Sequence, residues 1–272
     1  DHAMLHLLAA SAKTMGYLGY KSYITGKTGA HFHIGLYDGR EGELIALMQA
    51  DYLGQVRTGA ASGVATKFLA REDATTVGVL GSGKQARTQL EAICKVRNIT
   101  RAHVYSSTPD HRKAFAQEMS NVCDTEVIAV EDPESAVRNL DILVTATAAR
   151  EPVLHGSWLS EGAHINAIGS NFRGKAELDV PAVRRCASIF VDSKDQARKE
   201  AGDLFPAIDE GVIEWSDVRE LGKVLVGRFA GREHPEDITL FKSLGIGIED
   251  VAVAGIVYEK AKEQGVGREW NW

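Results

Sequence analysis

The middle of the chain alternates short apolar segments with longer amphipathic ones. From Thr75 onward, bursts rich in Val and Ile are separated by segments with helical periodicity, such as KQARTQLEAICKVR at 84–97. The bursts are TTVGVLG at 75–81, RAHVYSS at 101–107, TEVIAV at 125–130, DILVTAT at 141–147, AHINAIG at 163–169 and ASIFVDS at 187–193. The Thr-Pro and Asp-Pro pairs at 108–109 and 132–133 are typical helix starts. This alternation predicts an α/β fold with a Rossmann-type, doubly wound parallel sheet.

The first seventy residues follow a different pattern. Three antiparallel strands are predicted there: YLGYKSYIT at 17–25, AHFHIGLYD at 30–38 and GELIALMQ at 42–49. Turn residues at 38–42 connect the last two, and a helix is expected from about 51 to 70. Another helix is predicted at 248–265, with Gly265 as its C-cap, and we expect it to pack back on the N-terminal part. Three strands cannot bury both faces of a sheet, so a homodimer is predicted.

Charge and cysteine content narrow the class of protein. A net charge of −6 provides no basic field for nucleic acid or an anionic membrane surface. The cysteines Cys94, Cys123 and Cys186 are an odd number at wide spacing, which matches neither a disulfide framework nor a zinc site. No apolar run approaches the roughly 18 residues that span a bilayer, and no secretory signal opens the chain. Because the first residue is Asp1 rather than Met, we expect the natural N-terminus to be missing. A cytoplasmic protein without nucleic-acid or membrane partners is expected.

The stretch GVLGSGKQAR at 78–87 fits two nucleotide-binding patterns. A phosphate loop would need Ser or Thr after its lysine to bind magnesium, but Gln85 stands there. A dinucleotide fingerprint needs a tight turn at Gly81, close backbone approach at Gly83 and a small residue at Ala86. The strand before and the helix after the stretch favour the second pattern. The expected cofactor-binding residues of this loop are Gly81, Ser82, Gly83, Lys84, Gln85 and Ala86.

The end of the next strand bears on the choice between NAD and NADP. NAD-binding proteins carry an acid there for the ribose hydroxyls, whereas this strand ends Ser106-Ser107-Thr108, with Arg112 one turn on. Hydroxyls and an arginine suit a 2′-phosphate, which a carboxylate would repel. The alternative is a helix cap followed by a solvated arginine. We therefore predict NADP(H) as the preferred cofactor, with NAD(H) also accepted.

Together, several phrases resemble the ornithine cyclodeaminase and mu-crystallin family. They are GYKSYIT at 19–25, QVRTGAAS at 55–62, GVLGSGKQA at 78–86, VTATAAREPV at 144–153, HINAIGSNFRGKAEL at 164–178 and TLFKSLGIGIEDVAVA at 239–254. They occur in the family's order and extend over nearly the whole chain. The resemblance implies a dinucleotide-binding Rossmann domain at 71–239. It also implies a discontinuous α+β substrate-binding and dimerisation domain, made of 1–70 and 240–272.

The resemblance also implies roles for single residues. Lys21 resembles the family's active-site lysine, and Arg57 resembles its substrate-carboxylate arginine. Further cofactor contacts are implied around the strand end at Thr145, Ala146 and Thr147, and at Lys175 and Ser243, which match positions near the nicotinamide. Ser107 stands where NAD-using cyclodeaminases carry an acid, which again favours NADP.

Asn171 departs from the cyclodeaminase pattern. Ornithine cyclodeaminases place a catalytic Asp in this phrase, and an amide cannot act as a general base at neutral pH. Members with Ser-Asn here resemble the imino-acid reductases of the family. Asn171 and Lys21 are therefore the expected catalytic residues of a reductase.

Hydride transfer to a C=N bond requires a cation for the α-carboxylate and a proton source for the nitrogen. The planar guanidinium of Arg57 can bind the carboxylate through two parallel hydrogen bonds. The alternative interpretation of Arg57 is a solvent-exposed arginine on a surface helix. Lys21, flanked by Tyr20 and Tyr23, would have a lowered pKa if partly buried; its alternative is a solvent-facing strand lysine. His31 and His33 share one strand face, but no third metal ligand is evident, so no metal site is predicted.

The predicted activity is therefore reduction of small α-imino acids, such as Δ1-pyrroline-2-carboxylate or Δ1-piperideine-2-carboxylate, by NAD(P)H. Ornithine cyclodeaminase or alanine dehydrogenase activity is the alternative among enzymes. A non-catalytic, crystallin-like NADP-binding protein is the alternative of another class, and the presence of both Lys21 and Arg57 counts against it.

Overall fold

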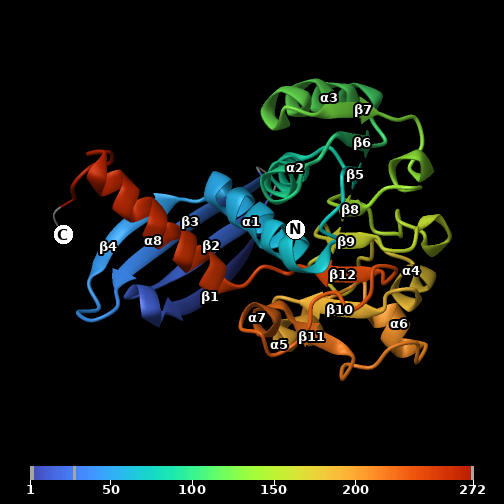
Figure 1. Ribbon diagram of the computed structural model, residues 1–272. Coiled ribbons are helices and arrows are strands. Elements are labelled where there is room, and N and C mark those ends of the chain that lie inside the picture. Colours follow the sequence, from blue (N-terminus) through green and yellow to red (C-terminus); the bar gives the residue numbers. More distant parts are fainter. Residues whose placement is uncertain (1–2, 27–28, 271–272) are drawn as a thin grey trace. The chain divides into compact units, whose positions relative to one another are not determined.

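The computed structural model describes residues 3–26 and 29–270 (Figure 1). The chain folds into two compact units, of which unit 1 comprises Asp1–Arg57 and Gly245–Trp272 and unit 2 comprises Thr58–Leu244. Helix α1, Asp51–Leu69, begins in unit 1 and continues into unit 2. The boundaries predicted from the sequence, near residues 70 and 240, lie slightly farther into the parallel-sheet domain.

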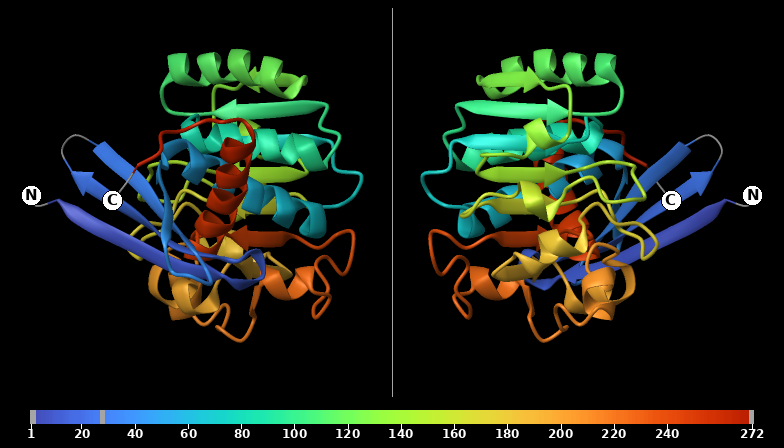
Figure 2. Two further views of the ribbon diagram at one scale, coloured as in Figure 1. Left: turned by 90° about the vertical axis from the view of Figure 1, so that its left-hand side faces the viewer. Right: turned by 90° about the vertical axis from the view of Figure 1, so that its right-hand side faces the viewer.

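Unit 2 is built on an eight-stranded sheet in the order β11-β10-β12-β9-β8-β5-β6-β7, and every neighbouring pair is parallel. The strands are β5 Thr76–Leu80, β6 Arg101–Tyr105, β7 Glu126–Ala129, β8 Ile142–Thr145, β9 His164–Ala167, β10 Ser188–Val191, β11 Val218–Glu220 and β12 Thr239–Lys242. The helices are α2 Lys84–Val96, α3 Pro109–Cys123, α4 Val180–Arg184, α5 Lys194–Glu200, α6 Phe205–Asp209 and α7 Leu221–Leu225. Figure 2 shows these strands lying side by side. The doubly wound α/β prediction is confirmed.

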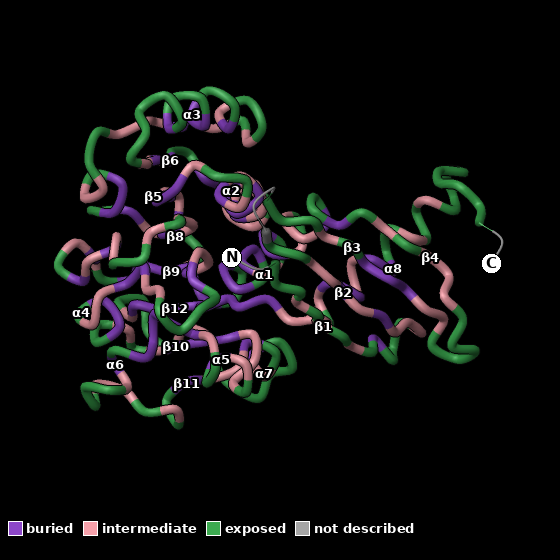
Figure 3. The backbone as a smooth tube through the Cα atoms, turned by 180° about the vertical axis from the view of Figure 1, so that it is seen from behind, coloured by how far each residue is buried: buried purple, intermediate pink, exposed green. Residues whose placement is uncertain are grey.

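Both faces of this sheet are buried because alternate residues of each strand enter different core clusters. In β8, Leu143 packs with β9 and α4, whereas Ile142 and Val144 pack with α2 and α3. In β12, Leu240 joins the first of these clusters and Phe241 packs against α1 and α7. The strands therefore appear as continuous apolar runs in the sequence, and Figure 3 shows buried stretches concentrated in them.

Unit 1 contains a four-stranded antiparallel sheet in the order β1-β2-β3-β4, with helix α8 against one face. The strands are β1 Met4–Ala12, β2 Tyr17–Gly26, β3 Gly29–Asp38 and β4 Leu44–Gln49, and α8 is Gly247–Glu263. The core of this unit joins Ile34 and Leu36 of β3 to Val251 and Ala254 of α8. The turn expected at 38–42 is present, because Asp38 accepts the backbone N–H groups of Arg40 and Glu41.

The secondary structure differs from the sequence-based expectation in several places, among them the first strand and the segment after residues 132–133. Strand β1 was not predicted, because MLHLLAASA is apolar on both faces and lacks the alternation of a half-buried strand. A helix was expected after 132–133, but only a three-residue 3-10 turn, Glu134–Ala136, follows. Asp132 still caps this turn by accepting the backbone N–H of Ser135 at 2.8 Å.

Candidate active site

The glycine-rich turn after β5 has the geometry expected of a dinucleotide loop. Gly81 has φ +111°, and a Cβ there would lie 2.4 Å from the carbonyl oxygen of Ala146, so only glycine fits. Gly83 is the N-cap of α2 and makes no side-chain cap, and a Cβ built on it would have no heavy atom within 4 Å. Ala86 is fully buried where α2 meets the sheet. The uncapped start of this 13-residue helix suits a diphosphate, because its first N–H groups lack partners within the helix.

The end of β6 lies beside this loop. The Ser82 hydroxyl donates to the Ser106 hydroxyl at 2.9 Å, while Ser107 and Thr108 are exposed. Arg112 is only 4% exposed: it donates to the Ser106 carbonyl at 3.1 Å, pairs with Glu131 and lies over the Tyr105 ring. Arg112 is therefore a buried side chain with partners inside the protein, and not the solvated arginine of the alternative interpretation. Lys84 is exposed and Gln85 is half-buried at the start of α2.

The carboxyl ends of β8 and β9 are joined by a buried carboxylate that the sequence analysis did not single out. Glu177 is fully buried and accepts the Thr145 hydroxyl at 2.9 Å and the Gly169 N–H at 2.7 Å. The Thr147 N–H and hydroxyl both donate to its other oxygen, each at 2.6 Å. Its only sequence signal was its place in the phrase at 164–178.

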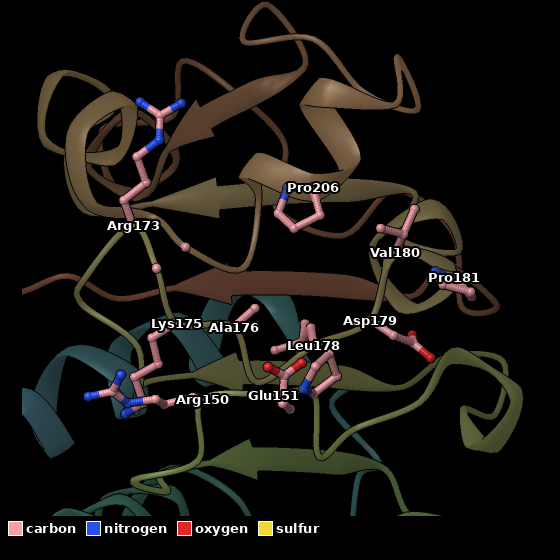
Figure 4. A pocket seen from close by; sticks show the side chains of 13 residues that line it. Arg150, Glu151, Arg173, Lys175, Ala176, Leu178, Asp179, Val180, Pro181 and Pro206 are labelled. Carbon is pink, nitrogen blue, oxygen red and sulfur yellow. The ribbon is translucent and has the colours of Figure 1, made fainter.

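Lys175 lies in the same region, two residues before Glu177. Its ammonium donates to the Thr147 carbonyl at 2.8 Å and to the Gly169 carbonyl, and burial lowers its pKa. Lys175 also lines a pocket of about 470 Å³ with Arg150, Glu151, Arg173 and Asp179 (Figure 4). The expected cofactor residues Ala146, Thr147 and Lys175 are thus gathered at one edge of the sheet.

Asn171 and Ser243 have different surroundings. Asn171 is exposed, in the segment that leads to Lys175. Ser243 follows β12, is 3% exposed and has its hydroxyl 3.4 Å from Asp192 Oδ2, which also accepts the N–H of Leu244.

Unit 1 brings Lys21 and Arg57 together around two acidic residues of α8. Lys21 Nζ lies 2.8 Å from Asp250 Oδ2, and Arg57 Nε lies 2.9 Å from Asp250 Oδ1. Arg57 Nη1 also pairs with Glu249 at 2.9 Å. Asp250 is fully buried and Lys21 is 4% exposed, whereas Arg57 and Glu249 are 10% and 21% exposed. The Arg57–Glu249 pair is therefore the more accessible part of the cluster.

The surroundings of this cluster set the pKa of Lys21 and the position of the Arg57 guanidinium. Burial and the neighbouring Arg57 charge lower the pKa of Lys21, while Asp250 opposes the shift. Gly245 has φ +78°, and a Cβ there would lie 2.3 Å from Arg57 Nη1, so the guanidinium occupies space that only glycine leaves free. Asp250 and Glu249 were not predicted from the sequence, because acids in the first turn of a helix are common and the helix dipole alone explains them.

The described residues contain neither a metal-binding cluster nor a membrane-spanning helix. His31 and His33 are exposed on β3, and no group of three metal-ligating side chains occurs within 3–26 and 29–270. In the same ranges, no helix has the length and apolar character needed to cross a bilayer.

Comparisons with known proteins identify the family of the chain and similar solved structures. The model of the ornithine cyclodeaminase/mu-crystallin family matches residues 6–265. A Delta(1)-pyrroline-2-carboxylate reductase of Bacillus cereus is 42% identical over 233 residues, covering 85% of this chain and 71% of the relative. The structure of the Thermococcus litoralis Delta(1)-pyrroline-2-carboxylate reductase with NADH and L-proline has a TM-score of 0.89 and 38% identity, covering 98% of this chain and 90% of that chain. An archaeal alanine dehydrogenase dimer with bound NAD has a TM-score of 0.87 and 34% identity, covering 99% and 89%.

Proposed function

Because the chain belongs to the ornithine cyclodeaminase/mu-crystallin family, we propose that it is an NAD(P)H-dependent reductase of small cyclic α-imino acids. Δ1-Pyrroline-2-carboxylate and Δ1-piperideine-2-carboxylate are the proposed substrates. The observation that carries the proposal is the Lys21–Arg57 cluster in unit 1. Its two cations match the two polar groups of such a substrate, the α-carboxylate and the imine nitrogen.

Each residue of the cluster has a proposed role. Arg57 holds the substrate carboxylate with its planar fork, in exchange for its accessible pair with Glu249. Lys21 gives its proton to the imine nitrogen, because burial lowers its pKa toward the range useful for proton transfer. Asp250 keeps both cations in place. When bound, the reduced nicotinamide supplies the hydride that adds to the imine carbon.

Unit 2 is proposed to hold the cofactor. Gly81, Gly83 and the start of α2 would take the diphosphate, and the segments after β8 and β9 would take the nicotinamide half. Asn171 would contact the substrate or nicotinamide by hydrogen bonds. It cannot serve as the base that a cyclodeaminase needs, which favours simple reduction over cyclisation.

The cofactor preference is a finer proposal. We propose NADP(H) as preferred and NAD(H) as accepted, because the exposed hydroxyls at Ser107 and Thr108 replace a ribose-binding acid. Arg112 contributes less than expected, since it is buried and paired with Glu131. In Ser107→Asp the new carboxylate would face the 2′-phosphate at a cost of a few kcal/mol for charges about 4 Å apart. The ratio of kcat/KM for NADPH to that for NADH should fall sharply. A wild type that prefers NADH would contradict this proposal.

We also propose a cytoplasmic homodimer. The sheet face opposite α8 carries exposed Leu5, Leu7, Ile24 and Leu47, at 65%, 64%, 47% and 63% exposure, and a second copy would cover them. The similar archaeal alanine dehydrogenase is a dimer. Sedimentation at micromolar concentration should give twice the chain mass, and a stable monomer would contradict the proposal.

The experiment that tests the function is NAD(P)H oxidation with a panel of substrates. Δ1-Pyrroline-2-carboxylate and Δ1-piperideine-2-carboxylate should be reduced at least tenfold more efficiently than pyruvate with ammonia, the alanine dehydrogenase reaction. That second activity is retained as a candidate because of the similar archaeal enzyme. Binding of NADPH without oxidation by any substrate would favour a crystallin-like binding protein.

A further inference from the structure

Lys175 and Glu177 contact the same two residues through opposite kinds of backbone group. Glu177 accepts the backbone N–H groups of Thr147 and Gly169, whereas Lys175 donates to the backbone carbonyls of Thr147 and Gly169. Thr147 follows β8 and Gly169 follows β9. In each of these two residues the Glu177 carboxylate therefore holds the N–H group and the Lys175 ammonium holds the carbonyl group. We call this arrangement the clasp.

We propose that Lys175 and Glu177 are positioning residues that fix the nicotinamide half of the cofactor by locking the segments after β8 and β9 with this clasp. The inference rests on the proposed function, because it takes the ligand to be NAD(P)H. It gives Lys175 an indirect role, through the backbone of its neighbours.

The place of the clasp in the sheet identifies the half of the cofactor. The order of neighbouring strands is β6, β5, β8, β9, and a dinucleotide lies across the carboxyl ends of such strands. The ribose-binding position follows β6 at Ser107 and the diphosphate loop follows β5 at Gly81. The segments after β8 and β9 therefore lie at the other end of the cofactor, which is the nicotinamide end.

The clasp also fixes the hydrogen-bonding character of two threonines. A threonine hydroxyl has one proton, and those of Thr145 and Thr147 are both donated to Glu177. Thr147 additionally accepts the N–H of Ala149 at 3.1 Å, which leaves it an acceptor toward any ligand. Thr145 is fully buried and serves as an anchor for the carboxylate. A carboxamide or ribose hydroxyl supplies the donor that Thr147 requires, whereas an ionised phosphate does not.

Packing alone does not explain why the fully buried residue at position 177 carries a carboxylate. Among the described residues no ammonium or guanidinium lies within ion-pair distance of Glu177. Its carboxylate accepts four hydrogen bonds, three from Thr147 and Gly169 and one from Thr145 at the end of β8, and it also interacts electrostatically with the Lys175 charge. Desolvating an ion is costly unless such donors are fixed around it. A buried ion pair holds the backbone that carries Glu177. Lys242 lies 3.0 Å from Asp203, and Asp203 accepts the N–H groups of Glu177 and Leu178.

Binding of two ligands separates this role from a general structural one. The dissociation constants of NADPH, NADH and ADP-ribose, which lacks the nicotinamide, are measured for wild type, Glu177→Gln and a control, Glu161→Gln, whose side chain is exposed in the turn before β9. In Glu177→Gln the amide presents N–H groups to donors, so the constants for NADPH and NADH should rise at least tenfold. That for ADP-ribose should change less than twofold, and Glu161→Gln should match wild type for all three.

Equal weakening of all three ligands, or no weakening, would overturn the proposal. If Glu177→Gln fails to bind ADP-ribose because it is unfolded, Lys175→Met tests the proposal instead. This variant removes only the hydrogen bonds to the carbonyl groups of Thr147 and Gly169. Lys175→Met should again weaken the nicotinamide ligands alone, and Lys175→Arg should restore part of the affinity. A wild type that binds the dinucleotides but reduces no imine would contradict the proposed function and leave this binding test intact.

Discussion

The charged clusters of the two units use their charges in opposite ways. In unit 1 each cation faces a carboxylate directly, with Lys21 and Arg57 both paired to Asp250. In unit 2 Lys175 and Glu177 face the backbone of Thr147 and Gly169. A direct ion pair can exchange its carboxylate for that of a substrate, whereas charges that hold backbone groups fix the shape of a segment. The Lys21–Arg57 cluster is therefore suited to binding a small anion, and the clasp to holding the segments after β8 and β9 in a fixed shape.

The largest expected effect is on the stability of unit 1. Asp250→Asn removes the common counter-charge of Lys21 and Arg57, and breaking a buried pair costs about 3–5 kcal/mol. Urea unfolding should register this loss, while the exposed control Glu41→Gln should stay within about 0.5 kcal/mol of wild type. A loss below about 1 kcal/mol for Asp250→Asn would mean that the cluster is not a buried ion-pair network.

The next effect concerns substrate binding. Arg57→Lys replaces a planar fork by a point charge and should cost about 1.5–3 kcal/mol, a rise in KM for the imino acid of roughly 10- to 150-fold. Affinity for NADPH should stay nearly unchanged, and the exposed control Arg40→Lys should leave both constants alone. An equal loss of cofactor affinity would move Arg57 out of the substrate site.

A smaller effect is expected from the glycine that makes room for Arg57. Gly245→Ala and Gly16→Ala both strain a positive φ, +78° and +76°, at about 1–3 kcal/mol each. Only at Gly245 would the new Cβ meet the guanidinium, since nothing lies within 4 Å of the Cβ position at Gly16. Both variants should lose thermal stability, but only Gly245→Ala should raise KM. Equal KM values would show that the guanidinium position is unimportant for binding.

The smallest effect is a pH dependence. Burial and Arg57 lower the pKa of Lys21 from its ordinary 10.5, so the rate of imine reduction should fall as pH rises through this lowered value. The unfolded chain keeps this proton up to the ordinary value, so between the two values the free energy of unfolding should rise with pH. In Lys21→Met the stability slope should disappear along with the activity. A kcat profile that is flat at alkaline pH would exclude Lys21 as the proton donor.

The sequence predicted the features that depend on local pattern and not those that depend on partners far away in the chain. The strands β5 to β10 were predictable because burial on both faces makes them continuous apolar runs. Strands β11 and β12 were not predicted: β11 is the three-residue segment VRE, and β12 ends on Lys242, which looks polar but is fully buried against Asp203. Sequence alone reached Gly81 through its spacing, and Lys21 and Arg57 through family resemblance. It missed Asp250 and Glu177, because their importance lies in partners that are far away in the chain.

The measurement that tests the central claim most directly follows the hydride. The protein is incubated with Δ1-pyrroline-2-carboxylate and NADPH carrying deuterium at the transferable position of C4, and with ornithine and NADP⁺ in a parallel reaction. The account predicts proline with deuterium at Cα, formed in equal amount to the cofactor oxidised, and no proline from ornithine. Proline and ammonia released from ornithine without net cofactor turnover would contradict it.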